Sequence, residues 1–280
     1  MSGVTGLSLY TLTEKTETAQ LASFAKTPTV KQATAAFSAA APTITTVDEL
    51  LNNYKALSVA LGSVGLSGVI NQRALLKEVL TQDPKASKSY VNQVSDARFR
   101  QFATNFGSLS TDGGAKLKNA SFIQNVNSNY VQNQFEKSIG KQDTYVQQSM
   151  YFTRLASGAT GKDAMNSILA DATLGAVVRG AYSLPSSVGG FDPSVQKTML
   201  TAQGFDVTKL QDPAYVKNIA ERYLLVNDQS ASSSSSSLLS LFNGSTSSGN
   251  SILSTVEANT GGTSTGTSSS SNASLINLFA

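Results

Sequence analysis

Residues 49–80 read ELLNNYKALSVALGSVGLSGVINQRALLKEVL, and residues 167–200 read SILADATLGAVVRGAYSLPSSVGGFDPSVQKTML. Apolar side chains recur at matching places in these two stretches, and the matched pairs are Leu51 with Leu169, Val59 with Val177, and Leu66 with Leu184. The similarity resumes after a short gap, where Val79-Leu80 matches Met199-Leu200. Apolar residues that occur twice at helical spacing predict a duplicated helical unit.

Shorter echoes flank both stretches, with residues 30–32 (VKQ) matching 146–148 (VQQ) and residues 90–94 (YVNQV) matching 215–219 (YVKNI). The two predicted repeats therefore cover about residues 20–107 and 135–228. No segment of the first 228 positions alternates convincingly between apolar and polar residues, as a half-buried strand would. We therefore predict an all-α, multihelical domain over residues 19–228, preceded by a flexible polar N-terminus at residues 1–18.

Local signals set the expected ends of the helices. Thr46 followed by Glu49 predicts a capping box, and Asp212 before a proline predicts the start of the last helix. Gly62 and Gly65 are expected to end the first helix, which would bury a stripe formed by Leu50, Leu51, Tyr54, Leu57 and Leu61. The expected helices are residues 46–61, 67–80, 90–106, 115–155, 163–169, 174–182, 193–202 and 213–227, with a polar turn at residues 108–114.

The composition changes after Asp228. Residues 229–280 are rich in Ser, Thr, Gly and Asn, and Glu257 is the one charged side chain among them. Two apolar islands interrupt this tail, SLLSLF at residues 237–242 and SLINLF at residues 274–279. Apolar islands in a polar spacer are typical of short docking motifs, and the candidate protein-docking residues are Leu238, Leu239, Leu241, Phe242, Leu275, Ile276, Leu278 and Phe279. The alternatives are that the islands fold back onto the helical domain, or that they have no role.

Catalysis is not expected, because the chain has no His and no Cys and its charged residues amount to only 14%. Histidine is the usual general acid or base, and cysteine and histidine are the usual ligands of transition metals. The pairs Asp96/Arg98 and Glu221/Arg222 are candidate acid–base pairs, but we interpret both as ion pairs or caps on polar helix faces, with a shared role in the two repeats. We predict no enzyme, no catalytic residue, no metal and no cofactor.

The charge distribution limits the partners. The formal net charge is +3, and the basic residues are scattered rather than gathered in a block, so no nucleic acid is expected. No apolar run is long enough for a transmembrane segment, and no small-molecule substrate is inferred. The first residues lack the basic and apolar regions of a cleaved signal peptide, which leaves export by a route that reads an uncleaved N-terminus. The expected partners are therefore other proteins, including copies of the chain itself.

Several motifs occur in a fixed order, and they are residues 44–51 (ITTVDELL), 60–66 (ALGSVGL), 75–80 (LLKEVL), 94–99 (VSDARF), 134–143 (QFEKSIGKQD), 184–185 (LP) and 191–192 (FD). Together they resemble the alphaproteobacterial family catalogued as domain of unknown function 1217, over roughly residues 19–228. The resemblance implies a multihelical fold and a gene that often lies among flagellar genes, and it implies no known activity.

The leading functional hypothesis is a non-enzymatic structural or accessory protein of the flagellar system, located at the flagellum or secreted by the flagellar export route. The alternative is a cytoplasmic helical adaptor or chaperone for flagellar export substrates. A surface or secreted adhesin with a glycosylated Ser/Thr-rich tail is a further possibility that the sequence leaves open.

Overall fold

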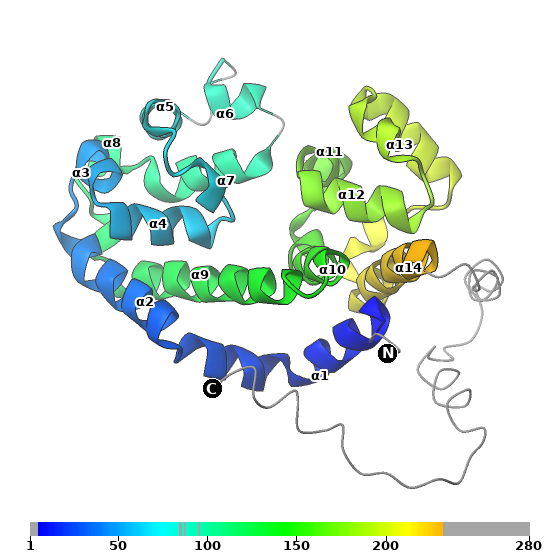
Figure 1. The fold of residues 1–280 in the computed structure, drawn as a ribbon. Helices are drawn as coiled ribbons and strands as arrows, with labels where there is room; N and C mark the ends of the chain where they lie inside the picture. The colour runs from blue at the N-terminus through cyan, green and yellow to red at the C-terminus, as the bar shows by residue number, and fades with distance from the viewer. Residues whose placement is uncertain (1–4, 84–85, 87, 95, 232–280) are drawn as a thin grey trace, which may run out of the picture. The chain divides into compact units, whose positions relative to one another are not determined.

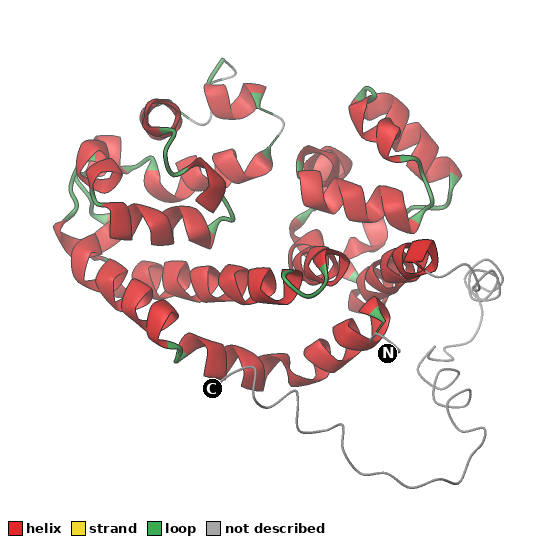
Figure 2. Cartoon of the chain, in the orientation of Figure 1, coloured by secondary structure: helices red, strands yellow, loops and turns green. Residues whose placement is uncertain are grey.

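Helices make up all the regular structure of the part of the chain that this computed structural model describes, which is residues 5–83, 86, 88–94 and 96–231 (Figures 1 and 2). The α-helices are α1 (Gly6–Ala25), α2 (Pro28–Ala40), α3 (Val47–Asn52), α4 (Tyr54–Ser63), α5 (Arg73–Thr81), α6 (Tyr90–Gln93), α7 (Ala97–Phe106), α8 (Leu109–Asp112), α9 (Ala120–Gly140), α10 (Thr144–Leu155), α11 (Ala164–Ala170), α12 (Ala172–Ala181), α13 (Pro193–Ala202) and α14 (Pro213–Ala231). Short 3₁₀ turns join them, and they are η1 (Ala41–Thr43), η2 (Ser67–Val69), η3 (Lys116–Lys118), η4 (Ala156–Gly158), η5 (Gly161–Asp163), η6 (Ser186–Gly190) and η7 (Val207–Gln211). The prediction of an all-α fold is confirmed.

Capping side chains explain where several helices begin. The predicted capping box of α3 is present, since the Glu49 N–H donates to Thr46 Oγ1 at 3.2 Å and the Thr46 N–H donates to Glu49 Oε2 at 3.3 Å. The predicted cap of α14 is also present, because the Ala214 N–H donates to Asp212 Oδ1 at 2.9 Å. Each cap satisfies an N–H group that has no partner within its own helix.

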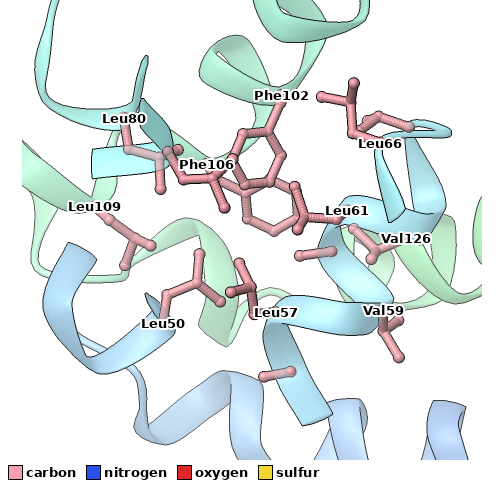
Figure 3. Packing of buried hydrophobic residues seen from close by; sticks show 14 of the residues in the cluster. Leu50, Leu57, Val59, Leu61, Leu66, Leu80, Phe102, Phe106, Leu109 and Val126 are labelled. Atoms are coloured by element: carbon pink, nitrogen blue, oxygen red, sulfur yellow. The ribbon is translucent and has the colours of Figure 1, made fainter. Parts of the chain in front are cut away.

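Two hydrophobic cores lie side by side along α9. The first core contains side chains of α2, α3, α4, α5 and α7 together with Val126 and Tyr130 of α9. Figure 3 shows part of this core, where the Phe102 and Phe106 rings of α7 point toward Leu61 of α4. The second core contains side chains of α10, α11, α12 and α14 together with Phe135 and Ile139 of α9. The helix α9 therefore contributes its first half to one core and its second half to the other.

The N-terminal segment is a helix from Gly6 onward, so the prediction of a flexible N-terminus over residues 1–18 is wrong for the described residues 6–18. Its polar side chains bond to distant helices: Tyr10 Oη lies 2.8 Å from Thr153 Oγ1 of α10, and Lys217 Nζ of α14 lies 2.6 Å from Glu14 Oε2. Such long-range partners give no local sequence signal. The helix α1 has almost no apolar stripe, which is why its sequence looks like a polar arm.

Several predicted helices are interrupted, each for a local reason. Asn53 leaves the helical conformation and caps α4, so the predicted helix over residues 46–61 is two helices, and Tyr54 is 59% exposed instead of buried. Asp96 caps α7 and separates it from α6. Asp143 caps α10, so the predicted helix over residues 115–155 is interrupted after α9. The segment expected to be a polar turn at residues 108–114 contains α8, which buries Leu109.

Matched contacts recur in the two halves. The helix α4 packs against α2 and α9, as α12 packs against α10 and α14. A Cβ atom added at Gly62 of α4 would lie 2.6 Å from the Tyr130 ring of α9, and one added at Gly180 of α12 would lie 2.5 Å from the Tyr223 ring of α14. These contacts favour the duplication, which stays a prediction. Residues 90–93 form α6, which packs against α5 and α7, whereas residues 215–219 lie in α14, so these contacts do not support the match of residues 90–94 with 215–219, and it stays a prediction.

All the described residues belong to one compact unit of the chain. Within the described ranges, no helix has the length and hydropathy that a membrane crossing requires. The Ser-rich tail beyond Ala231 lies outside the described residues.

Candidate functional site

The residues predicted to dock other proteins lie outside the described residues, so the structure does not place them; they are Leu238, Leu239, Leu241, Phe242, Leu275, Ile276, Leu278 and Phe279. Function could also lie in other places within the described part of the chain. They are the two candidate acid–base pairs, a buried polar network between α9 and α10, a surface groove between α1, α2 and α9, and a polar hollow beside α3.

The pair Asp96/Arg98 is an ion pair with a structural task. Arg98 Nη2 lies 2.7 Å from Asp96 Oδ2, and Asp96 also caps α7 by accepting from the Arg98 N–H at 3.0 Å. Arg98 Nη1 donates to the carbonyl of Gly65 at 3.1 Å, which fixes the turn after α4. The hydrogen bonds to Asp96 raise the pKa of Arg98, so its guanidinium stays charged. This pair therefore holds α7 against the end of α4.

The pair Glu221/Arg222 has a different arrangement, so the prediction of a shared role is wrong. The Arg222 guanidinium lies over the Tyr182 ring, 4.8 Å from its centre, which is a cation–π contact. Glu221 is half-buried, and burial raises the pKa of its carboxyl, while nearby Lys217 lowers it. Adjacent residues in a helix point in different directions, which explains why these two have separate environments.

A buried polar network joins the two halves. Glu136 of α9 is 2% exposed, and its carboxylate accepts from Arg154 Nε at 2.6 Å and from Arg154 Nη2 at 2.9 Å. Arg154 Nη2 also donates to Asn133 Oδ1 at 2.9 Å, and Asn133 Nδ2 donates to the carbonyl of Ser63 at 2.8 Å. The network thus ties α10, through α9, to the last turn of α4.

A separate polar contact lies beside this network at the start of α12, and the Arg154 guanidinium lies 5.4 Å from the centre of the Tyr151 ring. Tyr151 Oη donates to Asp171 Oδ2 at 2.7 Å, and Asp171 caps α12 by accepting from the N–H groups of Thr173 and Leu174. Burial and the neighbouring Asp171 carboxylate raise the pKa of Tyr151 well above its usual range. A phenol that stays protonated donates a hydrogen bond and does not act as a base near neutral pH. These contacts therefore orient helices, and sequence reasoning missed them because Glu136 and its partner Arg154 lie on different helices.

No other described cluster suggests a metal site, since no group of three or more acidic side chains gathers within the described ranges. The polar side chains of the network are bonded to one another rather than turned toward an open hollow. The hydrogen bonds of the network therefore hold helices together inside the protein.

The groove lies between the second half of α1, Thr34 and Ser38 of α2, and the first half of α9. The helices α1 and α2 follow one another along one side of α9 (Figure 1). Its volume is about 860 Å³, and its apolar lining comes from Leu21, Ala22, Ala25, Ile123 and Val131. Glu17 is the one charged residue among the described residues that line it, and Glu17 Oε1 accepts from Gln132 Nε2 at 2.8 Å. Sequence reasoning missed this groove because residues 1–18, which include the larger part of α1, were expected to be flexible.

A second hollow, of about 630 Å³, lies beside α3 and the start of α4. Its lining is mostly polar or charged and includes Asp48, Glu49 and Lys55, next to the exposed Tyr54 ring. Because Glu49 already serves the capping box, the groove of α1, α2 and α9 is the stronger candidate for binding an apolar partner.

The comparisons with known proteins identify the fold but no activity. No curated protein matches this chain. A crystal structure of protein AGR_C_984 from Agrobacterium tumefaciens is similar to it, with a TM-score of 0.70 and 22% sequence identity over 79% of this chain and 92% of that one. At this level of identity the likeness shows the fold alone. The model of a family described as protein of unknown function (DUF1217) matches residues 63–216, which is more than half of the chain. As the ordered motifs indicated, the chain belongs to the DUF1217 family.

Proposed function

We propose that this chain is a non-enzymatic structural or accessory protein of the bacterial flagellar or motility system, which acts through protein–protein contacts. The observation that carries the proposal is the groove between α1, α2 and α9, a mostly uncharged hollow on the surface of a body with two packed cores. Apolar hollows of this kind are suited to side chains of another protein. The flagellar setting comes from the gene neighbourhood that the family resemblance implies.

The internal use of the charged groups supports a non-enzymatic role. Asp96, Glu136 and Asp171 each bond to a partner within the chain, as a cap, an ion pair or both. A catalytic acid or base needs to reach a substrate from a cleft, and these three groups are committed to holding helices.

The route to the flagellum follows from the same proposal. We propose export through the flagellar apparatus, with the protein then found at the flagellum or in the medium. The alternative is a cytoplasmic adaptor or chaperone, in which the same groove would hold a segment of an export substrate until the substrate leaves the cell.

Fractionation of a tagged protein tests this proposal. The tag belongs between Gly161 and Lys162, which are exposed and lie in the short turn η5, rather than in residues 108–114, where α8 buries Leu109. Cytoplasm, purified flagella and medium are assayed in cells with and without a working flagellar export gate, with a cytoplasmic enzyme as the control for lysis.

We expect the tagged protein outside the cytoplasm only when the export gate works. Retention in the cytoplasm of both strains would overturn the proposal and favour the adaptor. Release into the medium of both strains, without the cytoplasmic control, would show another export route and would also overturn it.

A further inference from the structure

The groove between α1, α2 and α9 has the dimensions of a short peptide segment. The lining residues of α9 run from Ala120 to Gln132, and a helix rises 1.5 Å per residue, so the floor is about 18 Å long. A six-residue segment in an extended conformation spans about 20 Å. The length of the floor therefore suits a segment of about this size.

The walls of the groove are small and uncharged. Ala22 and Ala25 of α1 and Ser38 of α2 line the hollow, and Ile123 and Val131 of α9 contribute apolar side chains to its floor. Small side chains leave room for large ones from a partner, as in a groove that accepts Leu and Phe anchors. Charged side chains of a bound segment would lose hydration in this groove, and Glu17 is the one residue of its described lining that could form an ion pair with them.

One polar group in the lining is unsatisfied. Asn127 Nδ2 donates to Ser38 Oγ at 2.8 Å, while Asn127 Oδ1 is buried and accepts no hydrogen bond from the described residues. An unsatisfied buried acceptor is unfavourable, so the Asn127 side chain would gain by turning toward a donor brought by a ligand. The groove therefore suits an apolar segment that carries a hydrogen-bond donor near its middle.

The chain itself contains two segments of this chemistry. The islands at residues 237–242 (SLLSLF) and 274–279 (SLINLF) are uncharged and six residues long, and each has two apolar residues on either side of a donor, Ser240 or Asn277. Both lie in residues 232–280, beyond the last described helix.

We infer that the groove between α1, α2 and α9 binds an apolar island from the tail of a second copy of this chain. The inference rests on the proposed function and names the partner for its protein–protein contacts. Because the groove and the island are different surfaces, the contact is heterologous: the copy that supplies the island keeps its own groove free, and the other copy keeps its islands free. Copies of the chain would therefore associate head to tail, and the association would extend with concentration.

The test uses sedimentation velocity of the full chain from micromolar to millimolar concentration. A groove variant, Ala22→Glu, places a charge on the exposed wall of the groove. Its matched control is Ala19→Glu, on an exposed position of the same helix that does not line the groove. A tail variant carries Leu241→Ser, Phe242→Ser, Leu278→Ser and Phe279→Ser, which removes anchors from both islands.

We expect the unchanged chain and Ala19→Glu to associate with rising concentration, and the groove and tail variants each to associate at least tenfold more weakly. The groove variant keeps both islands and the tail variant keeps its groove, so the mixture should form complexes of one groove-variant chain with one or two tail-variant chains, which do not grow further. This recovery also shows that both variants are folded. Ser128→Arg, on the exposed α9 side of the groove, gives a second groove variant for the same mixture.

Three results would overturn the inference. The first is that the unchanged chain stays monomeric at every concentration, as it would if each tail occupied its own groove. The second is that the mixture of groove and tail variants does not associate, and the third is that the Ala19→Glu control associates as weakly as Ala22→Glu. None of them bears on where the protein is located, so the export experiment can succeed while this inference fails.

Discussion

Gly65 and Ser183 end two different helices with the same left-handed turn. Their φ angles are +78° and +56°, and each donates its N–H to a carbonyl three residues earlier, Gly62 at 3.2 Å and Gly180 at 2.9 Å. The next residues complete the motif, since Leu66 donates to Leu61 at 2.8 Å and Leu184 donates to Arg179 at 2.9 Å. Both turns are Schellman motifs, and Ser183 occupies a position that usually holds glycine.

Exchanging the residues at these two turns should change stability in opposite directions. A left-handed conformation costs a residue with a side chain about 1–2 kcal/mol, so Gly65→Ser should lower the free energy of unfolding by about that amount. Ser183→Gly should raise it by a smaller amount, about 0.5 kcal/mol, because glycine also loses more freedom on folding. Urea unfolding of both variants measures the two changes in the free energy of unfolding. If both variants were stabilised, or both destabilised, this account would be contradicted.

The close approach of a tyrosine ring to Gly62 and to Gly180 predicts a second pair of effects. A methyl group at either position would lie within 2.6 Å of the Tyr130 or Tyr223 ring, so Gly62→Ala and Gly180→Ala should each destabilise the fold by about 1–3 kcal/mol. Gly68→Ala is the matched control, because its methyl group would have no atom within 4 Å. Thermal unfolding of the three variants measures the change in stability. If Gly68→Ala lost as much stability as Gly62→Ala, contact with the tyrosine ring would not be the cause.

The buried pair Glu136/Arg154 should show strong coupling. Removing one partner leaves the other buried without its counter-charge, so Glu136→Leu alone should cost about 3–5 kcal/mol of stability. The double variant Glu136→Leu/Arg154→Met should cost less than the sum of the two single variants, since it leaves no charge stranded. A double-mutant cycle from urea unfolding measures this coupling, and additive losses would show that the ion pair does not link α9 to α10.

The half-buried Glu221 predicts a pH dependence. Burial raises the pKa of its carboxyl in the folded protein, so the folded state binds this proton more tightly than the unfolded state does. Its contribution to stability is therefore most favourable below the unfolded pKa of about 4.3, and it declines as the pH rises toward the folded pKa. Glu221→Gln should then raise the melting temperature at about pH 7 relative to the unchanged chain, and do so less at about pH 3.

Glu49 provides the contrasting control for this pH experiment. Hydrogen bonds from the Thr45 N–H and hydroxyl lower the pKa of the Glu49 carboxyl, so its contribution is present above the unfolded pKa and is lost as the pH falls. Glu49→Gln should therefore lower the melting temperature at neutral pH and have less effect in acid. The same pH trend in both variants would contradict the assigned causes.

The sequence predicted those parts of the fold that depend on neighbours along the chain. The capping box at Thr46 and the cap at Asp212 were found because each joins residues no more than three positions apart. The breaks at Asn53 and Asp143 were missed, although both are capping residue types, because the apolar spacing continued across them. At Asn53 and Asp143 the signal for a helix cap competes with apolar spacing that favours a continuous helix, and tertiary packing determines which of the two prevails.

The candidate site depended instead on contacts between distant segments. The helix α1 is fixed by Thr153 and Lys217, and no pattern within residues 6–25 reveals those partners. Since α1 forms one wall of the groove, the groove could not be predicted without it. The burial of Glu136 was hidden for a similar reason, because its partner Arg154 lies on another helix.

Asp228 closes the first turn of α1, accepting from the Gly6 N–H at 3.0 Å and from the Leu7 N–H at 3.2 Å. The helix α1 therefore gains this contact only after a carboxylate more than two hundred residues further along the chain has been made. Contacts of such wide sequence separation form slowly, because a long loop must close before they contribute. The α1 wall of the groove is thus among the last parts of the described fold to be completed, both in synthesis and in refolding.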